Sequence, residues 1–280
     1  MTYKTILLHL HDVRRAQRLL DVACPLARKM DAHLIALNVM PPFVALPGGE
    51  MGGMTVTVDA HRMTYREEIV QLKARFSEVS RTHNLKSEWR EADANFASAA
   101  SVVVEHGRVC DLIIASQKDP KWSYSEYLEE PERLAIDSGR PVLLVPNKGN
   151  IAATPKRVTI AWNNSREAVR AVFDALPLLL GTDEVNIVWV HPERDQPDAG
   201  DLPGAEISTV LSRHGIKCVV SQSTAVNIGI ADEILRQAHA FGSDLLVMGV
   251  YGHSRLREFI LGGASREMLV EMNRLVLMSH

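Results

Sequence analysis

The sequence has no long hydrophobic run, few cysteines and no excess of either charge, and each absence excludes a class of protein. No apolar stretch approaches the roughly 20 residues that a membrane-spanning helix needs. The first residues, Met1–Lys4, lead directly into a strand-like apolar run, so we expect no signal peptide. The formal net charge of −3 predicts no general affinity for nucleic acid or for acidic membranes.

The cysteines predict neither a disulfide framework nor a zinc site. Cys24, Cys110 and Cys218 are odd in number and far apart, and none belongs to a C-x-x-C pair. We therefore expect a protein of the reducing cytoplasm.

Motifs for catalysis are also missing. There is no G-x-S-x-G nucleophile elbow and no Walker A sequence. His9, His11 and Asp12 could suggest a metal, but no matching cluster occurs elsewhere, so we assign them to turn and surface roles. We predict no catalytic residue and no metal ligand, and whether the chain is an enzyme stays open, with slow ATP hydrolysis as the most that we expect.

What the sequence does contain is a regular alternation of strands and helices. Apolar runs predict strands over residues 4–10, 32–39, 86–91, 111–115 and 141–145, and again over 157–162, 184–190, 216–222, 244–248 and 275–278. Helical spacing predicts helices over residues 13–30, 59–83, 96–106 and 124–137, and again over 165–180, 205–214, 230–241 and after residue 263. Residues 41–53 are rich in Pro and Gly and are interpreted as a loop, and 147–155 as a linker.

The two halves of the chain align with each other. Ala16-x-Arg18 matches Ala168-x-Arg170 at an offset of 152, and Asp111-Leu112-Ile113 matches Asp244-Leu245-Leu246 at an offset of 133. A repeat of this length predicts two copies of one domain, 1–147 and 156–280. Strand-helix alternation predicts an α/β fold in which each copy has a five-stranded parallel sheet with right-handed crossovers, a Rossmann-like nucleotide-binding architecture.

A glycine-rich stretch near the C-terminus carries the strongest functional motif. An apolar strand ending at Met248 is followed by Gly249, Gly252 and Gly262, which have the spacing G-x2-G-x9-G. A helix then begins around Gly263, Ala264 and Ser265. Glycines before the free amides of a helix N-terminus predict a phosphate site, to which His253 could add a donor. The alternative is a mobile loop with a helix cap.

At these residues the chain resembles the universal stress proteins. ATP-binding members of that family carry G-x2-G-x9-G followed by Ser or Thr, between the fourth strand and fourth helix of a five-stranded domain. Gly249, Gly252 and Gly262 match this pattern, whereas Gly263 departs from it and lacks the hydroxyl that would contact phosphate. Whether Ser265 compensates stays open.

The resemblance also implies where the rest of a nucleotide would lie. The family's crevice lies between the first and fourth strands, and the first strand usually ends in an Asp that holds the adenine and ribose end. In this chain Asn163 occupies the position of that Asp. The alternative is that Asn163 only forms a turn. The predicted nucleotide-binding residues are Asn163, Val190, Met248, Gly249, Gly252, His253, Gly262, Gly263, Ala264 and Ser265.

The first half has lost the glycine motif. At the offset of 133, Gly249 corresponds to Ser116, Gly252 to Asp119, and Gly262 and Gly263 to Glu129 and Glu130. We expect these two carboxylates to suit a helix N-terminus and to repel a polyphosphate. The predicted site is therefore confined to the second half.

The resemblance implies a cytoplasmic stress-response regulator that binds ATP or another adenine nucleotide, with or without Mg²⁺. The alternatives are an enzyme that hydrolyses nucleotide or transfers a nucleotidyl group, and a ligand-free interaction protein. Because single domains of the family pair their last strands, we expect strands 141–145 and 275–278 to pair and the halves to form an intramolecular pseudo-dimer. A further homodimer stays open, and neither nucleic acid nor membrane is an expected partner.

Overall fold

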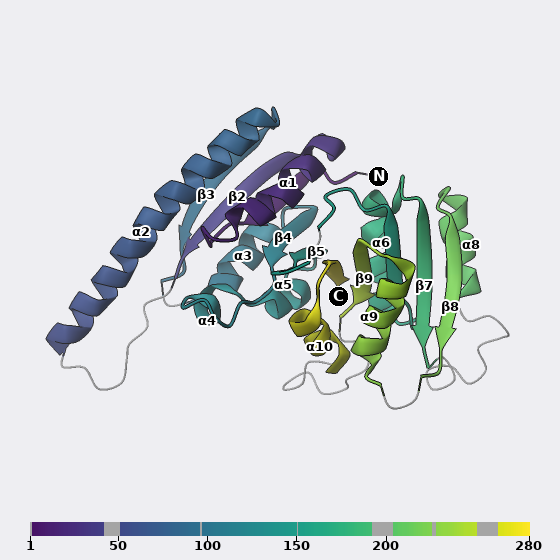
Figure 1. Cartoon of the computed structure of the whole chain (residues 1–280). Helices are drawn as coiled ribbons and strands as arrows, with labels where there is room; N and C mark the ends of the chain where they lie inside the picture. Colours follow the sequence, from purple (N-terminus) through teal and green to yellow (C-terminus); the bar gives the residue numbers. More distant parts are fainter. Residues whose placement is uncertain are drawn as a thin grey trace. The chain divides into compact units, whose positions relative to one another are not determined.

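The structure is a computed structural model, and it describes residues 2–41, 51–95, 97–149, 151–191, 204–225, 228–250 and 263–280, with the helical backbone alone over 51–62. The chain divides into two compact units, which we call the N-terminal unit, Tyr3–Ser138, and the C-terminal unit, Gly139–His280. Each unit is an α/β structure, as the alternation of strands and helices predicts (Figure 1).

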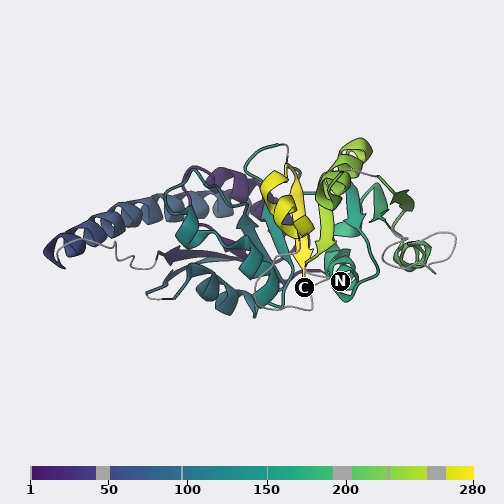
Figure 2. The same ribbon diagram turned by 90° about the horizontal axis from the view of Figure 1, so that it is seen from below.

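The N-terminal unit has four parallel strands in the order β3-β2-β1-β4. Its elements are β1 (Thr5–His9), α1 (Ala16–Met30), β2 (His33–Met40), α2 (Met51–Thr82), β3 (Ser87–Asp93), α3 (Ala99–Gly107), β4 (Leu112–Ser116), α4 (Ser125–Leu128) and α5 (Pro131–Asp137). Helices α1 and α2 cover one face of these strands, and α3 and α5 cover the other (Figure 2). Central strands covered on both faces must be apolar on both, and β1 and β4 are.

The C-terminal unit repeats the same plan. Its elements are β5 (Val142–Val145), β6 (Arg157–Ala161), α6 (Arg166–Leu179), β7 (Glu184–Val190), α8 (Ala205–Arg213), β8 (Cys218–Ser223), α9 (Ile230–Phe241), β9 (Leu245–Gly249), α10 (Gly263–Glu271) and β10 (Leu275–Ser279). The strand order is β5-β10-β9-β6-β7-β8. All neighbouring pairs from β10 to β8 are parallel.

Strand β5 pairs with β10 in the antiparallel sense, Val142 lying opposite Met278 and Leu144 opposite Val276. The two strands predicted to be the last of each half are thus neighbours in one compact unit. This grouping places the limit between the units after Ser138, whereas the sequence predicts a first domain that extends to residue 147. The domain bounds and the pseudo-dimer stay predictions.

Two elements differ from the sequence-based expectation. The helix predicted over residues 124–137 is two short helices, because Glu129 has an extended backbone and Pro131 starts a new helix. Helix α2 begins at Met51, inside the predicted loop 41–53. Glycines lower helix propensity by only about 1 kcal/mol each, which tertiary context can override. Residues 42–50 lie outside the described part of the chain.

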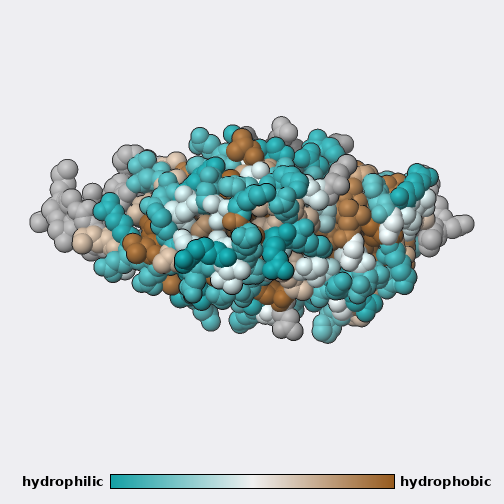
Figure 3. Space-filling view, turned by 90° about the horizontal axis from the view of Figure 1, so that it is seen from above, coloured by the Kyte–Doolittle hydropathy of each residue, from teal (hydrophilic) through white to brown (hydrophobic). Residues whose placement is uncertain are grey.

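The surface and the cysteines agree with the composition. Hydrophilic side chains predominate on the face in Figure 3, where hydrophobic ones form separate groups. All three cysteines are free. Within the described ranges, no helix has both the length and the apolar character that a membrane span requires.

Candidate functional site

The predicted crevice of the C-terminal unit lies where β6 and β9 are neighbours. From β6 the chain continues through β7 and β8 on one side, whereas β9 and β10 lie on the other, so the strand order reverses at this point. Ala161 pairs with both Met248 and Val188, which places the carboxyl ends of β6, β7 and β9 at one edge. In open α/β sheets this is the position where ligands bind. Asn163, Val190 and Gly249 come together there.

Asn163 forms a turn before α6. Its Oδ1 atom accepts a hydrogen bond from the Ser165 amide at 3.2 Å, and Asn164 has a positive φ of 56°. Ser165 is the predicted N-cap, and its hydroxyl accepts from the Ala168 amide at 3.2 Å. The alternative turn role of Asn163 is therefore present in the structure, and its contact with a nucleotide stays a prediction.

Gly249 makes a close backbone approach, and its neighbour is protein. A Cβ atom at this position would lie 2.5 Å from the Glu167 carbonyl carbon and 2.6 Å from the Ala168 amide nitrogen. Only glycine lets the end of β9 lie against the first turn of α6 at this distance. The glycine motif predicts a close approach to a ligand at this point, whereas the neighbour in the structure is the first turn of α6.

The other predicted site residues lie at strand ends, in the first turn of α10 or outside the described residues. Met248 and Val190 are 5% and 8% exposed at the ends of their strands. Gly263 is the first residue of α10, and Ala264 and Ser265 follow in its first turn. Gly252, His253 and Gly262 lie outside the described residues.

The start of α9 lies beside α10. A Cβ atom at Gly229, the residue before α9, would lie 3.3 Å from Glu267 Oε2 of α10 and 3.4 Å from Asp232 Oδ2. A helix N-terminus favours the binding of an anion, whereas these two carboxylates oppose it. The nearby Glu233 carboxylate is buried and accepts two 2.6 Å hydrogen bonds from Arg236, which lower the pKa of Glu233 to about 2 against the opposing effect of burial.

The corresponding part of the N-terminal unit holds a buried network around the carboxylate of Glu129. Its Oε1 atom contacts His11 Nε2 at 3.1 Å, accepts from the Ser116 hydroxyl at 3.0 Å and accepts from the Arg15 guanidinium. Its Oε2 atom accepts from the Asp119 amide and the Ser125 hydroxyl, both at 2.7 Å. Burial favours a raised pKa for Glu129, but the bond and charge of His11, the charge of Arg15 and the Asp119 amide lower it well below the ordinary value.

This network corrects one expectation and refines another. His9, His11 and Asp12 were expected on the surface, but they are 2%, 1% and 1% exposed. Glu129 and Glu130 directly precede helix α5, as the expected helix start requires, but the Glu129 side chain is buried and points into the protein. The sequence does not reveal that His11 and Arg15, more than 100 positions away, contact it. The offset alignment of Ser116, Asp119 and Glu129 with the three glycines is the signal that could have indicated it.

Two arginines and Asp12 extend the network toward the surface. Asp12 Oδ2 accepts from Arg14 Nη2 at 2.8 Å and from Arg15 Nε at 2.6 Å. Burial would raise the pKa of Asp12, but these hydrogen bonds lower it. Both guanidinium groups lie over the ring of Trp122. The Cζ atoms of Arg14 and Arg15 are 5.7 Å and 5.6 Å from the ring centroid. Arg14 Nη2 also lies 3.6 Å from Asp119 Oδ2, so the two guanidinium groups pair with three carboxylates, those of Asp12, Asp119 and Glu129.

Ser116, His11 and Glu129 lie together but lack the geometry of a catalytic triad. In a triad the base contacts the nucleophile with one ring nitrogen and its orienting carboxylate with the other. Here His11 Nε2 contacts both Ser116 and Glu129, whereas Nδ1 has no hydrogen-bond partner. In the described part of the chain, no group of three or more His, Cys, Asp or Glu side chains could hold a metal ion.

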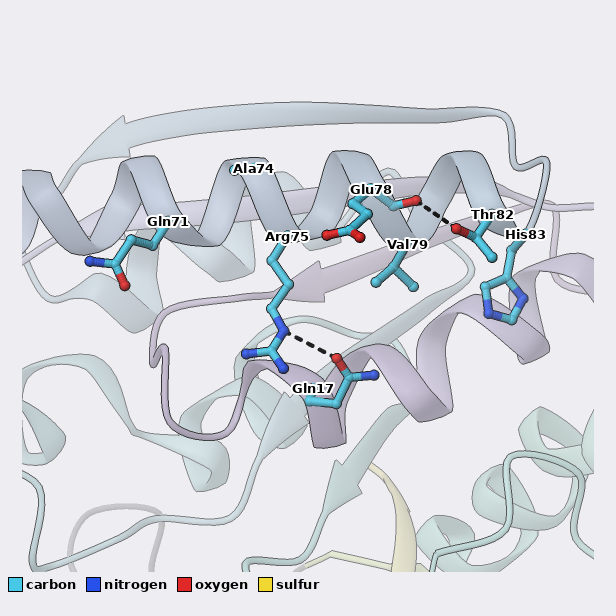
Figure 4. A pocket seen from close by; sticks show the side chains of 8 residues that line it. All are labelled: Gln17, Gln71, Ala74, Arg75, Glu78, Val79, Thr82 and His83. Carbon is cyan, nitrogen blue, oxygen red and sulfur yellow. Dashed lines mark hydrogen bonds between the residues drawn. The ribbon is translucent and has the colours of Figure 1, made fainter.

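A groove of about 610 Å³ lies elsewhere, between α1 and α2 (Figure 4). The Arg75 side chain reaches from α2 to Gln17 on α1, where its Nε donates at 3.1 Å. The remaining lining residues are Gln71, Ala74, Glu78, Val79, Thr82 and His83. The groove brings together no reactive group with a partner, so the strand ends carry the better candidate site.

Comparisons with known proteins identify relatives in sequence and in fold. No family model matches the chain. A universal stress protein of Synechocystis sp. is 30% identical over 164 residues, covering 57% of this chain and 54% of that protein, so the chain spans about half the length of this curated relative. The crystal structure of a universal stress protein from Archaeoglobus fulgidus DSM 4304 superposes with a TM-score of 0.71 at 16% identity, covering 99% of this chain and 96% of that one. The crystal structure of a putative universal stress protein from Pseudomonas aeruginosa UCBPP-PA14 superposes with a TM-score of 0.54 at 16% identity. This superposition covers 99% of this chain and 93% of that one.

Proposed function

We propose that this chain, which belongs to the universal stress protein family as a tandem of two α/β units, binds an adenine nucleotide in its C-terminal unit as part of a cytoplasmic stress response. The observation that carries the proposal is the β6/β9 reversal of strand order, directly followed in sequence by the glycine spacing of Gly249, Gly252 and Gly262. Such an edge is where open α/β sheets bind ligands, and glycines before a helix N-terminus favour phosphate.

The proposed roles follow the position of each residue. The amides of Gly252, Gly262 and Gly263, with those of Ala264 and Ser265 in the first turn of α10, would bind the phosphates. Asn163 would face the ribose and adenine, and Val190 and Met248 would flank the base. The other two proposed residues are Gly249 and His253. Mg²⁺ would accompany the phosphates of ATP rather than occupy a protein site of its own.

We expect a regulatory role rather than fast turnover. The Ser116–His11–Glu129 group of the N-terminal unit is buried and lacks the connectivity of a catalytic triad. Nucleotide occupancy would instead change a loop or an interface and so alter binding to a partner. ATP, ADP and AMP are the candidate ligands.

Calorimetric titration of the full chain with ATP tests the proposal. We expect one ATP per chain, and two per chain would refute the restriction to the C-terminal unit. Gly262→Val should abolish binding while the fold persists, because a β-branched side chain would block the approach of phosphate. Gly181→Ala is the control for replacing a glycine elsewhere in the same unit: a Cβ there meets no atom within 4 Å, and its effect is limited to the backbone strain at a φ of +86°. No heat at millimolar ATP, or full affinity in folded Gly262→Val, would contradict the site.

The same samples separate the rival functions. An enzyme would release ADP or transfer a nucleotidyl group far above the background rate, and Gly262→Val would abolish that turnover. An interaction protein without a ligand would show neither binding nor turnover. Slow hydrolysis with stoichiometric binding agrees with the regulatory role.

A further inference from the structure

We propose that Glu129 is a built-in anion: its carboxylate fills an anion site of the N-terminal unit, and removing it opens that site to a small external anion. The assignment of the anion site depends only on the contacts of Glu129. Its equivalence to a phosphate site in the C-terminal unit rests on the proposed function.

The internal repeat gives the first argument. Ser116, Asp119 and Glu129 occupy the sequence positions of Gly249, Gly252 and Gly262. In the N-terminal unit the first two of these residues bind the third, the Ser116 hydroxyl at 3.0 Å and the Asp119 amide at 2.7 Å. The loop that corresponds to the glycine-rich loop thus binds a carboxylate that the chain itself supplies.

The donor set gives the second argument. The two oxygens of Glu129 together contact five groups, which come from His11, Arg15, Ser116, Asp119 and Ser125. They include a backbone amide, two hydroxyls and a guanidinium, a mixture of donors that also suits phosphate. A carboxylate offers about four lone-pair positions, so this set leaves it fully occupied.

Two buried imidazoles give the third argument. His9 Nε2 and His11 Nδ1 have no hydrogen-bond partner, and the two rings stack at 4.2 Å. They line a cavity of about 10 Å³ together with Ser116 and Glu129. That volume is on the order of one water molecule. The site therefore has polar groups and space beyond those that the Glu129 carboxylate uses.

The contacts of Glu129 predict what removal of its carboxylate would do. Arg15 pairs with Asp12 and Glu129, and Arg14 pairs with Asp12 and Asp119. Without Glu129, the guanidinium of Arg15, whose side chain is only 11% exposed, loses one of its two carboxylate partners, and two buried serine hydroxyls lose this acceptor. Buried donors that lose their acceptor are strongly destabilising, and a small anion in the vacated space would accept their hydrogen bonds again.

Chemical rescue of the full-length Glu129→Gly variant tests the proposal. The variant places at 129 the residue type found at 262, and formate is the probe because it is a free carboxylate. Thermal unfolding is followed in sodium formate and in sodium chloride at equal ionic strength. The matched control is Glu130→Gly, which removes the adjacent carboxylate, paired with the half-exposed Arg133.

We expect Glu129→Gly to melt roughly 10 °C below the parent chain in chloride. Formate at about ten times its dissociation constant should raise that Tm by roughly 4 °C and leave the parent and Glu130→Gly unchanged. If the variant is unfolded in chloride, formate must restore its helical circular dichroism. A response no larger than that of Glu130→Gly, or a variant as stable as the parent, would overturn the proposal. The assay involves no nucleotide, so its outcome is independent of the ATP titration.

Discussion

Replacing Gly249 by alanine should destabilise the C-terminal unit even when no nucleotide is present. The new Cβ would lie 2.5 Å from the Glu167 carbonyl carbon, whereas carbon atoms in contact are about 3.5–4.0 Å apart. The first turn of α6 must therefore move by roughly 1 Å relative to β9. Overpacking lowers the free energy of unfolding by about 1–3 kcal/mol. We expect a loss of about 3 kcal/mol here, because the neighbouring atoms belong to the backbone rather than to a flexible side chain.

Urea unfolding measures this cost. With a slope of about 3 kcal/mol per molar urea, a loss of about 3 kcal/mol lowers the midpoint by about 1 M. Gly181→Ala is the control for backbone strain, because Gly181 has a φ of +86° and an added Cβ there meets no atom within 4 Å. The free energy of unfolding of that control should fall by only about 1–2 kcal/mol. A Gly249→Ala midpoint at or above that of Gly181→Ala would show that α6 does not require glycine at this position.

Two further predictions concern buried polar groups. Tyr65→Phe removes a hydroxyl that bonds the His11 and Val39 carbonyl oxygens at 3.2 Å and 3.4 Å, so urea unfolding should show a loss of about 1–2 kcal/mol; an unchanged midpoint would contradict it. Because the pKa of Glu233 is lowered to about 2 from 4.5, chiefly by Arg236, its stabilising effect should be present above about pH 4.5 and lost as the pH falls toward 2. The difference in urea midpoint between the parent and Glu233→Gln should shrink over that range, and a constant difference would refute the prediction.

The order of elements follows from local patterns that the sequence displays, because apolar runs and helical spacing identified the strands and helices. The resemblance to the universal stress proteins implied in addition that β6 and β9 would be neighbours, as they are. Capping is equally local, so Ser165 was identified correctly. The break between α4 and α5 was missed although Pro131 marks it, because helical spacing on both sides suggested one continuous helix.

The sequence could not reveal which residues, distant from one another along the chain, are in contact in the fold. Glycine at 249 indicates a close approach, but whether to a ligand or to α6 depends on tertiary packing. Taken alone, Glu129 is a carboxylate at the position that corresponds to Gly262 of the predicted phosphate site, which implies repulsion of phosphate. With His11 and Arg15 beside it, the same carboxylate is a fully bound anion. Charge at a single position therefore predicts neither attraction nor repulsion until its partners are known.

The two units would consequently respond differently to nucleotide. A tethered carboxylate such as Glu129 stays beside its donors at an effective concentration that no change in the cell can dilute. A nucleotide bound by the C-terminal unit instead exchanges with the surrounding pool, and its occupancy follows that concentration. The N-terminal unit would then be permanently in the anion-bound state. On the proposed function, a response of the chain to the level of nucleotide would therefore originate at the strand ends of β6 and β9.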